Sequence, residues 1–148
     1  MRAHPAGPRH ADQLVGAGLV APAGDLNALS AVWPQGSVRN ANGALVVGGC
    51  DVRELAGQYG TPLMLLDEAE VRQRARAFRQ AWVEVGAGFV YYAAKAFIAT
   101  RVARWVSEEG LGVDVATGGE LEVALRAGVP GSRLLMHGNN KSMAEIER

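Results

Sequence analysis

The feature that most restricts the fold of this chain is a regular alternation of short apolar runs with helical patterns. The apolar runs begin near residues 62, 89, 111 and 134. Each run is followed by a stretch whose apolar residues recur every three or four positions, which indicates an amphipathic helix. The interval of about 22 to 28 residues is the length of one strand–helix unit, and such units pair their strands in parallel. The sequence therefore predicts an α/β fold.

The patterns also predict individual elements. A strand over 62–66 precedes a helix that Asp67 caps, with its apolar positions facing inward. These inward positions are Val71, Ala75, Phe78 and Trp82. Nearer the N-terminus, the pattern predicts a short strand over 44–47 and a helix that Asp51 caps, reaching residue 59.

Four parallel strands begin either a (β/α)8 barrel or a doubly wound sheet, and a barrel needs eight to close. We predict that residues 44–148 form the N-terminal portion, about half, of a TIM-like (β/α)8 barrel from a longer protein. A C-terminal substrate domain would then be absent. Residues 1–43 contain four of the six prolines and show no sustained period, so we predict an irregular N-terminal arm, anchored by Trp33.

Composition excludes several classes of protein. Lysine plus arginine and aspartate plus glutamate both number 15, so no excess of positive charge favours nucleic acid or an anionic membrane as a partner. The single cysteine, Cys50, cannot form an internal disulfide or a thiolate metal cluster. No apolar run approaches the length of a membrane span, and the N-terminus lacks a secretory signal pattern. We expect a soluble, cytoplasmic protein.

Lys95 stands out because it interrupts the apolar run 89–97, whose first six residues are typical of a buried strand. Alternation along a strand puts Lys95 on the same face as Tyr91, and Val90 with Tyr92 on the other. A lysine at this place either reaches solvent along its own stem or has a chemical role. The pattern alone leaves both interpretations open.

Polar clusters follow the next two predicted strands as well. They are Asp114 with the run to Glu120, and His137 with the run to Lys141. Active sites of parallel α/β folds lie at the C-terminal ends of the strands. Each residue also has a structural interpretation: Asp114 and His137 as hydrogen-bonded strand ends, Glu120 as a helix-capping residue, and Lys141 as a solvated side chain. Glycines 118 and 119 are a weak indication of a phosphate site.

Three segments, taken together, resemble the diaminopimelate decarboxylases, which are pyridoxal-phosphate-dependent enzymes with an alanine-racemase-like barrel. The segments are Tyr91–Phe97, Asp114–Glu120 and His137–Ser142, in this order and spacing. The start of the first predicted strand, Gly60–Leu63, is also similar, and the N-terminal arm resembles that of actinobacterial members. Members of this family are roughly three times longer than this chain.

The resemblance implies that Lys95 carries pyridoxal 5'-phosphate covalently, with partial desolvation keeping its amine neutral. It implies that Asp114 and His137 line the cofactor site. It also implies that Glu120 supports these residues without contacting the cofactor itself. The implied reaction is decarboxylation of meso-2,6-diaminopimelate to L-lysine, by a homodimer when full length, with this chain inactive alone. Two alternatives remain open: a related decarboxylase of another basic amino acid or polyamine precursor, and a non-catalytic remnant that keeps the lysine.

Overall fold

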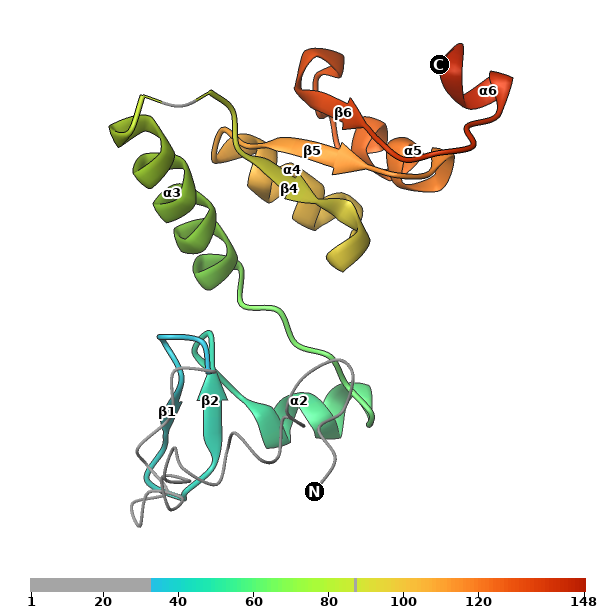
Figure 1. The fold of residues 1–148 in the computed structure, drawn as a ribbon. Coiled ribbons are helices and arrows are strands. Elements are labelled where there is room, and N and C mark those ends of the chain that lie inside the picture. Colours follow the sequence, from blue (N-terminus) through green and yellow to red (C-terminus); the bar gives the residue numbers. More distant parts are fainter. Residues whose placement is uncertain (1–32, 87) are drawn as a thin grey trace, which may run out of the picture. The chain divides into compact units, whose positions relative to one another are not determined.

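A computed structural model describes residues 33–86 and 88–148 (Figure 1). The chain divides into two compact units, one reaching Glu54 and the other running from Leu55 to Arg148. The sequence pattern predicts a boundary eleven residues earlier, at residue 43. The predicted irregularity of residues 1–32 lies outside the described residues.

The first unit contains a small antiparallel sheet in the order β1-β2-β3. Its strands are β1 (Val38–Arg39), β2 (Leu45–Val47) and β3 (Cys50–Asp51). The turn between β1 and β2 depends on Asn40, whose Oδ1 accepts a hydrogen bond from the Ala44 amide (2.9 Å) and whose Nδ2 donates to Asp51 Oδ2 (2.8 Å). Strand β2 agrees with the predicted strand.

Two features of the first unit differ from the prediction. Strand β1 lies within the range predicted as an irregular arm, because pairing with β2 through the Asn40 turn orders a two-residue segment that has no apolar period of its own. Trp33, predicted to be an anchor, is 41% exposed. Helix α2 (Val52–Tyr59) follows Asp51, whose carboxylate accepts from the Arg53 amide (2.8 Å), as the capping pattern predicted.

The second unit alternates helices and strands as the sequence predicted. In chain order the elements are α3 (Glu68–Glu84), β4 (Tyr91–Ala93), the 3-10 turn η1 (Ala94–Ala96), α4 (Thr100–Glu108), β5 (Gly112–Val115), α5 (Gly118–Arg126), the 3-10 turn η2 (Gly131–Arg133), β6 (Leu134–Met136) and α6 (Met143–Ile146). The strands form one parallel sheet in the order β4-β5-β6. No helix among the described residues has both the length and the apolar content needed to cross a membrane.

Residues 62–66 do not form the predicted strand. In the described residues, β4 pairs only with β5, so this segment has no neighbour with which to form a ladder. Its side chains are accordingly exposed, Met64 by 78% and Leu66 by 48%. An apolar run becomes a strand only through pairing, which the run itself does not specify.

The core of the second unit lies on one face of the sheet. Val113 and Val115 of β5 are fully buried there, against Ala103 of α4 and Ala124 of α5, which are also fully buried. Figure 1 shows α4 and α5 behind the sheet. Strand residues alternate between faces, so Asp114, which lies between the two valines, belongs to the opposite face. We call this opposite face, which no described helix covers, the open face.

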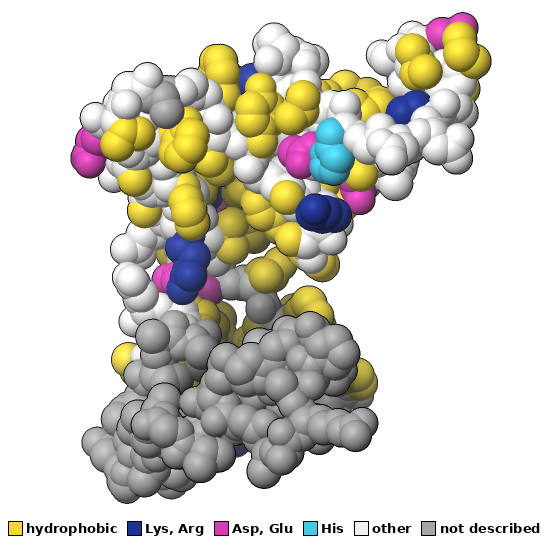
Figure 2. All heavy atoms as spheres, in the orientation of Figure 1, with side chains coloured by type: hydrophobic (Ala, Val, Ile, Leu, Met, Phe, Trp, Pro, Cys, Tyr) yellow, Lys and Arg dark blue, Asp and Glu magenta, His cyan; other side chains and the backbone are white. Residues whose placement is uncertain are grey.

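Helix α3 begins as predicted and then departs from the prediction. Asp67 caps it by accepting hydrogen bonds from the amides of Ala69 (2.9 Å) and Glu70 (3.3 Å), and Ala75 is buried in the core. Phe78 and Trp82, however, are 69% and 47% exposed, so their predicted inward orientation is wrong. Helical spacing fixes which residues share a face, but the length of the helix that is covered depends on its neighbours. Figure 2 shows such exposed hydrophobic side chains, in yellow, on the second unit.

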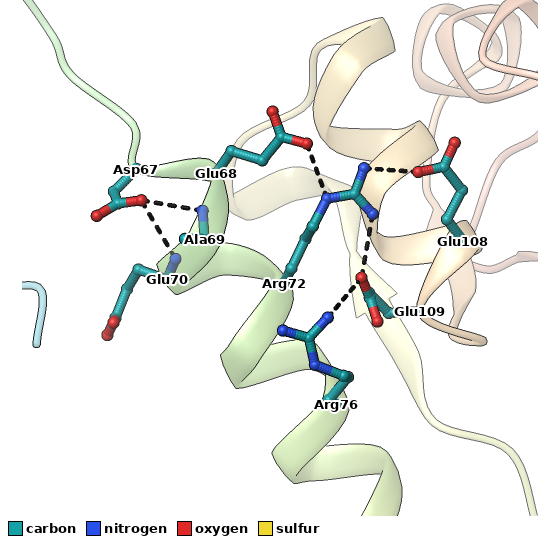
Figure 3. Close-up of polar contacts among 8 residues, drawn as sticks. All are labelled: Asp67, Glu68, Ala69, Glu70, Arg72, Arg76, Glu108 and Glu109. Carbon is teal, nitrogen blue, oxygen red and sulfur yellow. Dashed lines mark hydrogen bonds and ion pairs between the residues drawn. The ribbon is translucent and has the colours of Figure 1, made fainter. Parts of the chain in front are cut away.

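An ion-pair cluster joins α3 to α4 (Figure 3). The Arg72 guanidinium contacts Glu68 (2.8 Å), Glu108 (2.6 Å) and Glu109 (3.0 Å), and Arg76 adds a second contact to Glu109 (2.9 Å). Hydrogen bonding to Glu108, then to Glu68 and Glu109, raises the pKa of Arg72. Burial alone would raise the pKa of Glu109, but the hydrogen bonds from the two arginines outweigh it and lower that pKa.

Candidate active site on the open face of the parallel sheet

The strand register places Asp114 on the open face and brings the ends of β4 and β6 to either side of it. Ala93 of β4 is paired with Asp114 of β5, which is paired with Leu135 of β6. Side chains of paired residues in a parallel ladder point to the same face. His137 lies two residues after Leu135, and Lys95 lies two residues after Ala93. The register therefore puts Ala93, Asp114 and Leu135 on the open face, and Lys95 and His137 follow at the C-terminal ends of β4 and β6.

Asp114 and His137 form a direct pair. His137 Nδ1 contacts Asp114 Oδ1, and the two side chains are 42% and 20% exposed. The His137 amide donates to Val115 O (3.0 Å), which extends the β5–β6 ladder by one residue and sets the ring beside the carboxylate. With Nδ1 directed at a carboxylate, the proton of a neutral ring resides on Nδ1, and Nε2 remains available as an acceptor.

Lys95 lies in the turn η1, two residues beyond the end of β4. Its side chain is exposed, and no hydrogen bond or ion pair involving it occurs within residues 33–86 and 88–148. The predicted partial burial of this lysine is thus wrong for the structure described: the turn carries Lys95 past the last paired strand residue, where no described element covers it. The structure joins Asp114 to His137 and not to Lys95.

Tyr92 holds the turn that carries Lys95, a contact that sequence reasoning missed. Its hydroxyl donates to Phe97 O (2.6 Å), closing the turn from the strand that precedes it to the residue that follows it. Burial raises the pKa of the Tyr92 phenol. The predicted alternation separates Tyr92 from the face of Tyr91, and the Tyr92 ring packs against the core. Nothing in the sequence indicated that its hydroxyl would reach five residues ahead.

The sequence contains only two lysines, Lys95 and Lys141. They differ in their surroundings, because Lys141 is half-buried and its Nζ donates to Ala116 O. The interpretation of Lys141 as a solvated side chain is therefore wrong. Of the two primary amines, only that of Lys95 is both exposed and without a partner among the described residues. This difference favours Lys95 as the reactive amine.

Glu120 has the capping role suggested by the sequence. Its amide donates to Thr117 Oγ1 (3.2 Å), and its Oε2 accepts from the Ala116 amide (2.6 Å). It thereby fixes the loop between β5 and α5, two residues after Asp114. A role for Glu120 beyond this cap, in support of a cofactor, remains a prediction.

Glu145 is a second residue that sequence reasoning missed. Its Oε1 accepts from the Gly118 amide (2.8 Å) at the start of α5. Because this carboxylate already satisfies the Gly118 amide, the weak indication of a phosphate site at Gly118 is not supported. The pattern that could have identified Glu145 is its position three residues after Ser142, which is the spacing of a capping box.

Comparison with known proteins gives a consistent assignment. Residues 68–148 match the family described as "Pyridoxal-dependent decarboxylase, pyridoxal binding domain". The diaminopimelate decarboxylase of Mycobacterium leprae is 46% identical over 151 residues, which cover 99% of this chain and 32% of that protein. That of Bacillus subtilis is 46% identical over 111 residues, or 74% of this chain and 25% of that protein. The chain thus spans about a third or less of the length of these relatives.

Solved structures agree with the fold. The crystal structure of diaminopimelate decarboxylase from M. jannaschii in complex with L-lysine superimposes with a TM-score of 0.65 and 32% sequence identity, covering 77% of this chain and 27% of that one. AQ1208 from Aquifex aeolicus gives a TM-score of 0.64 and 32% identity. These matches confirm the predicted fold class, the N-terminal portion of a TIM-like barrel, and the family match confirms the predicted cofactor class, pyridoxal phosphate. The chain belongs to the pyridoxal-dependent decarboxylase family, whose pyridoxal binding domain it matches from residue 68 to residue 148.

Proposed function

We propose that this chain carries the lysine-bearing part of a diaminopimelate decarboxylase, which converts meso-2,6-diaminopimelate to L-lysine and carbon dioxide. The observation that carries the proposal is the exposed amine of Lys95, which has no partner among the described residues, at the C-terminal end of β4 and next to the sheet that bears the Asp114–His137 pair. The activity belongs to the natural polypeptide that contains this chain, and the 148 residues alone are proposed to be inactive.

The residues present fit pyridoxal 5'-phosphate as the cofactor. When bound, this cofactor supplies an aldehyde that condenses with amines and a conjugated ring that accepts the electron pair left by departing carbon dioxide. Attachment requires a primary amine that solvent can reach, and Lys95 meets this requirement whereas Lys141 is occupied. Lysine is also the side chain that condenses with the aldehyde of this cofactor.

The other residues have supporting roles in the proposal. Asp114 orients the His137 ring by accepting from Nδ1, which leaves Nε2 to hold or exchange a proton on the open face. Both side chains would line the cofactor site. Glu120 would act through the loop it caps, by keeping the Ala116 amide and therefore the end of β5 in place.

The resemblance carries two further proposals, a homodimer and a cytoplasmic location. A cytoplasmic location agrees with the single cysteine, Cys50, which is free and exposed. Light scattering of the natural polypeptide tests the homodimer: a mass of two chains is expected, and a mass of one chain would contradict it.

Substrate assays of the natural polypeptide, supplied with pyridoxal 5'-phosphate, test the function. Carbon dioxide release should be fastest from meso-2,6-diaminopimelate among a panel that includes L-ornithine, L-arginine and L-lysine. Lys95→Ala should abolish release, and Arg101→Met, on the exposed side of α4, should not change it. Faster release from another basic amino acid would reassign the substrate, and no release from any would favour a non-catalytic remnant. Substantial activity of Lys95→Ala would remove the site assignment.

A further inference from the structure

The segment after β6 is fastened to the loop after β5 by two side chains. Lys141 Nζ donates to Ala116 O, and Glu145 Oε1 accepts from the Gly118 amide (2.8 Å). These contacts join residues 25 and 27 positions apart in the sequence. They use the carbonyl and the amide of two loop residues that no strand ladder satisfies, so they tie the ends of two neighbouring strands together.

Glu145 links two helix starts with a single carboxylate. Its Oε2 accepts from the amide and the hydroxyl of Ser142 (2.9 Å each), which completes a capping box for α6, while its Oε1 serves α5. Hydrogen bonds from the backbone and the side chain of Ser142, followed by that from Gly118, lower the pKa of Glu145. The carboxylate is therefore ionised at neutral pH, the form in which it accepts these bonds best.

The backbone is shaped to allow these contacts. Gly138 has a φ of +103° and Asn140 a φ of +59°, which turn the chain back toward the β5 loop. A Cβ on Gly138 would lie 3.1 Å from Lys141 Nζ, and one on Gly118 would lie 3.3 Å from Glu145 Cγ. Both contacts thus depend on close approaches that a larger residue would disturb.

The backbone alone does not hold this segment. Strand β6 has three residues and α6 has four, and a helix of a single turn is not stable in isolation. Beyond the His137 amide, which bonds Val115 O, no further ladder bond joins the segment to β5 among the described residues. The position of His137 next to Asp114 therefore depends on what secures the chain after it.

We propose that Lys141 and Glu145 are positioning residues that fasten the segment 137–146 to the loop 116–118 and so hold His137 against Asp114. The description of this pair as part of a cofactor site rests on the proposed function. The fastening itself does not, because every contact in it lies within the chain.

Measurements on the cofactor-free natural polypeptide test the fastening. Glu145→Ala should raise the hydrogen-exchange rate of the Gly118 amide about tenfold, the effect of losing roughly one hydrogen bond, and Lys141→Met should also raise it because the loop loses its second attachment. Each should also shift the ring 15N signals of His137 at a fixed pH, because the ring loses its contact with Asp114. Lys141→Arg, which keeps a cationic donor, should restore most of the protection and the wild-type ring signals.

Glu147→Gln is the matched control, since it removes a carboxylate two residues from Glu145 whose side chain has no hydrogen bond or ion pair in the described part of the chain. It should leave both readouts unchanged. Unchanged exchange and ring signals in Lys141→Met and Glu145→Ala would overturn the proposal, as would equal changes in Glu147→Gln. If the two variants fail to fold, Glu145→Gln decides by the same readouts: a weaker acceptor should raise exchange at Gly118, and an unchanged rate would overturn the proposal.

The fastening tests and the tests of the proposed function can succeed or fail independently. If cofactor attachment to Lys95 fails while the fastening variants behave as expected, the positioning of His137 stands and only its purpose changes. If attachment succeeds and the fastening variants show no effect, the decarboxylase proposal stands without these two positioning residues.

Discussion

At the scale of single residues, the open face depends as much on an absent side chain as on the polar ones. Gly112 begins β5 opposite Tyr91. A Cβ on Gly112 would lie 2.5 Å from the Tyr91 ring and 2.8 Å from Arg133 O, distances that real Cβ atoms do not adopt. The Tyr91 ring therefore lies over Gly112, and the register of β4 and β5 requires residue 112 to have no side chain.

Gly112→Ala should destabilise the protein by about 1–3 kcal/mol, because the ring or the strand must move to admit a methyl group. The free energy of unfolding in urea, measured on the natural polypeptide, checks this. Gly131→Ala is the control, since a Cβ at Gly131 meets nothing within 4 Å. Equal stability of the two variants would show that Tyr91 does not pack on Gly112.

Tyr92→Phe should loosen the turn that carries Lys95. The variant loses the hydroxyl that donates to Phe97 O and keeps the ring in the core, so we expect a loss of about 0.5–1.5 kcal/mol. Amide exchange of residues 94–97 should rise. The Tyr91 hydroxyl has no such hydrogen bond among the described residues, so Tyr91→Phe should not raise amide exchange at residues 94–97. A matching rise in both variants would count against the role of the Tyr92 hydroxyl.

The sequence could predict where chemistry-bearing residues lie along the chain, but not which of them meet. Lys95, Asp114 and His137 follow apolar runs, and parallel strands bring such ends to one edge. The contacts of Lys141 with Ala116 and of Glu145 with Gly118 depend on how two loops fold over each other. That geometry arises from long-range packing, which no local pattern encodes.

At the scale of elements, α3 and α4 are joined by charge as well as by apolar contact. Arg72 bonds three carboxylates, two of which belong to α4 or directly follow it (Figure 3). A network in which one guanidinium serves several carboxylates is more effective than an isolated surface pair. Helix α3, whose C-terminal half exposes Phe78 and Trp82, therefore depends on its N-terminal half for attachment.

Arg72→Met should lower the denaturation midpoint of the natural polypeptide and reduce its dependence on added salt, which screens such pairs. Arg101→Met, which removes an exposed arginine from α4, is the control and should alter neither. An equal salt dependence of wild type and Arg72→Met would contradict a stabilising role for the cluster.

The same ion-pair cluster predicts how the stability of the folded state depends on pH. The lowered pKa of Glu109 means that its carboxylate stabilises the folded state above the ordinary glutamate range. This contribution to the stability of the folded state should be lost as the pH falls from the ordinary glutamate range to below the lowered pKa of Glu109. The loss should be smaller in Arg72→Met, as acid titration of the midpoint would show, and an identical acid profile would argue against the contact.

Periodicity predicted the type and order of the elements in the second unit, and it failed where a neighbour decides the outcome. Among the described residues, 62–66 have the composition of a strand but pair with no strand, and Phe78 has helical core spacing but is 69% exposed. Strand β1 is the converse case, since Asn40 and the pairing with β2 order a segment that has no period.

At the scale of the whole molecule, the second unit is a sheet with helices on one face and an open face opposite. Parallel sheets are stable when both faces are covered. Large hydrophobic side chains remain exposed, among them Phe89 at 69% and Met64 at 78%. The 148 residues alone should thus expose apolar surface that a complete barrel would bury.

The isolated 148-residue chain should therefore bind a hydrophobic dye and unfold without a sharp transition, or aggregate. The natural polypeptide that contains it should bind little dye and unfold cooperatively. A monomeric isolated chain with a cooperative transition and no dye binding would contradict the half-barrel interpretation.

The most direct test of the account is to locate the cofactor on the chain. The natural polypeptide, loaded with pyridoxal 5'-phosphate and reduced with borohydride, should yield one labelled peptide from this region, containing Lys95. Lys141→Arg should leave that label in place, and Lys95→Arg should remove it. Label on the peptide containing Lys141, or label that persists in Lys95→Arg, would contradict the central claim that Lys95 supplies the reactive amine.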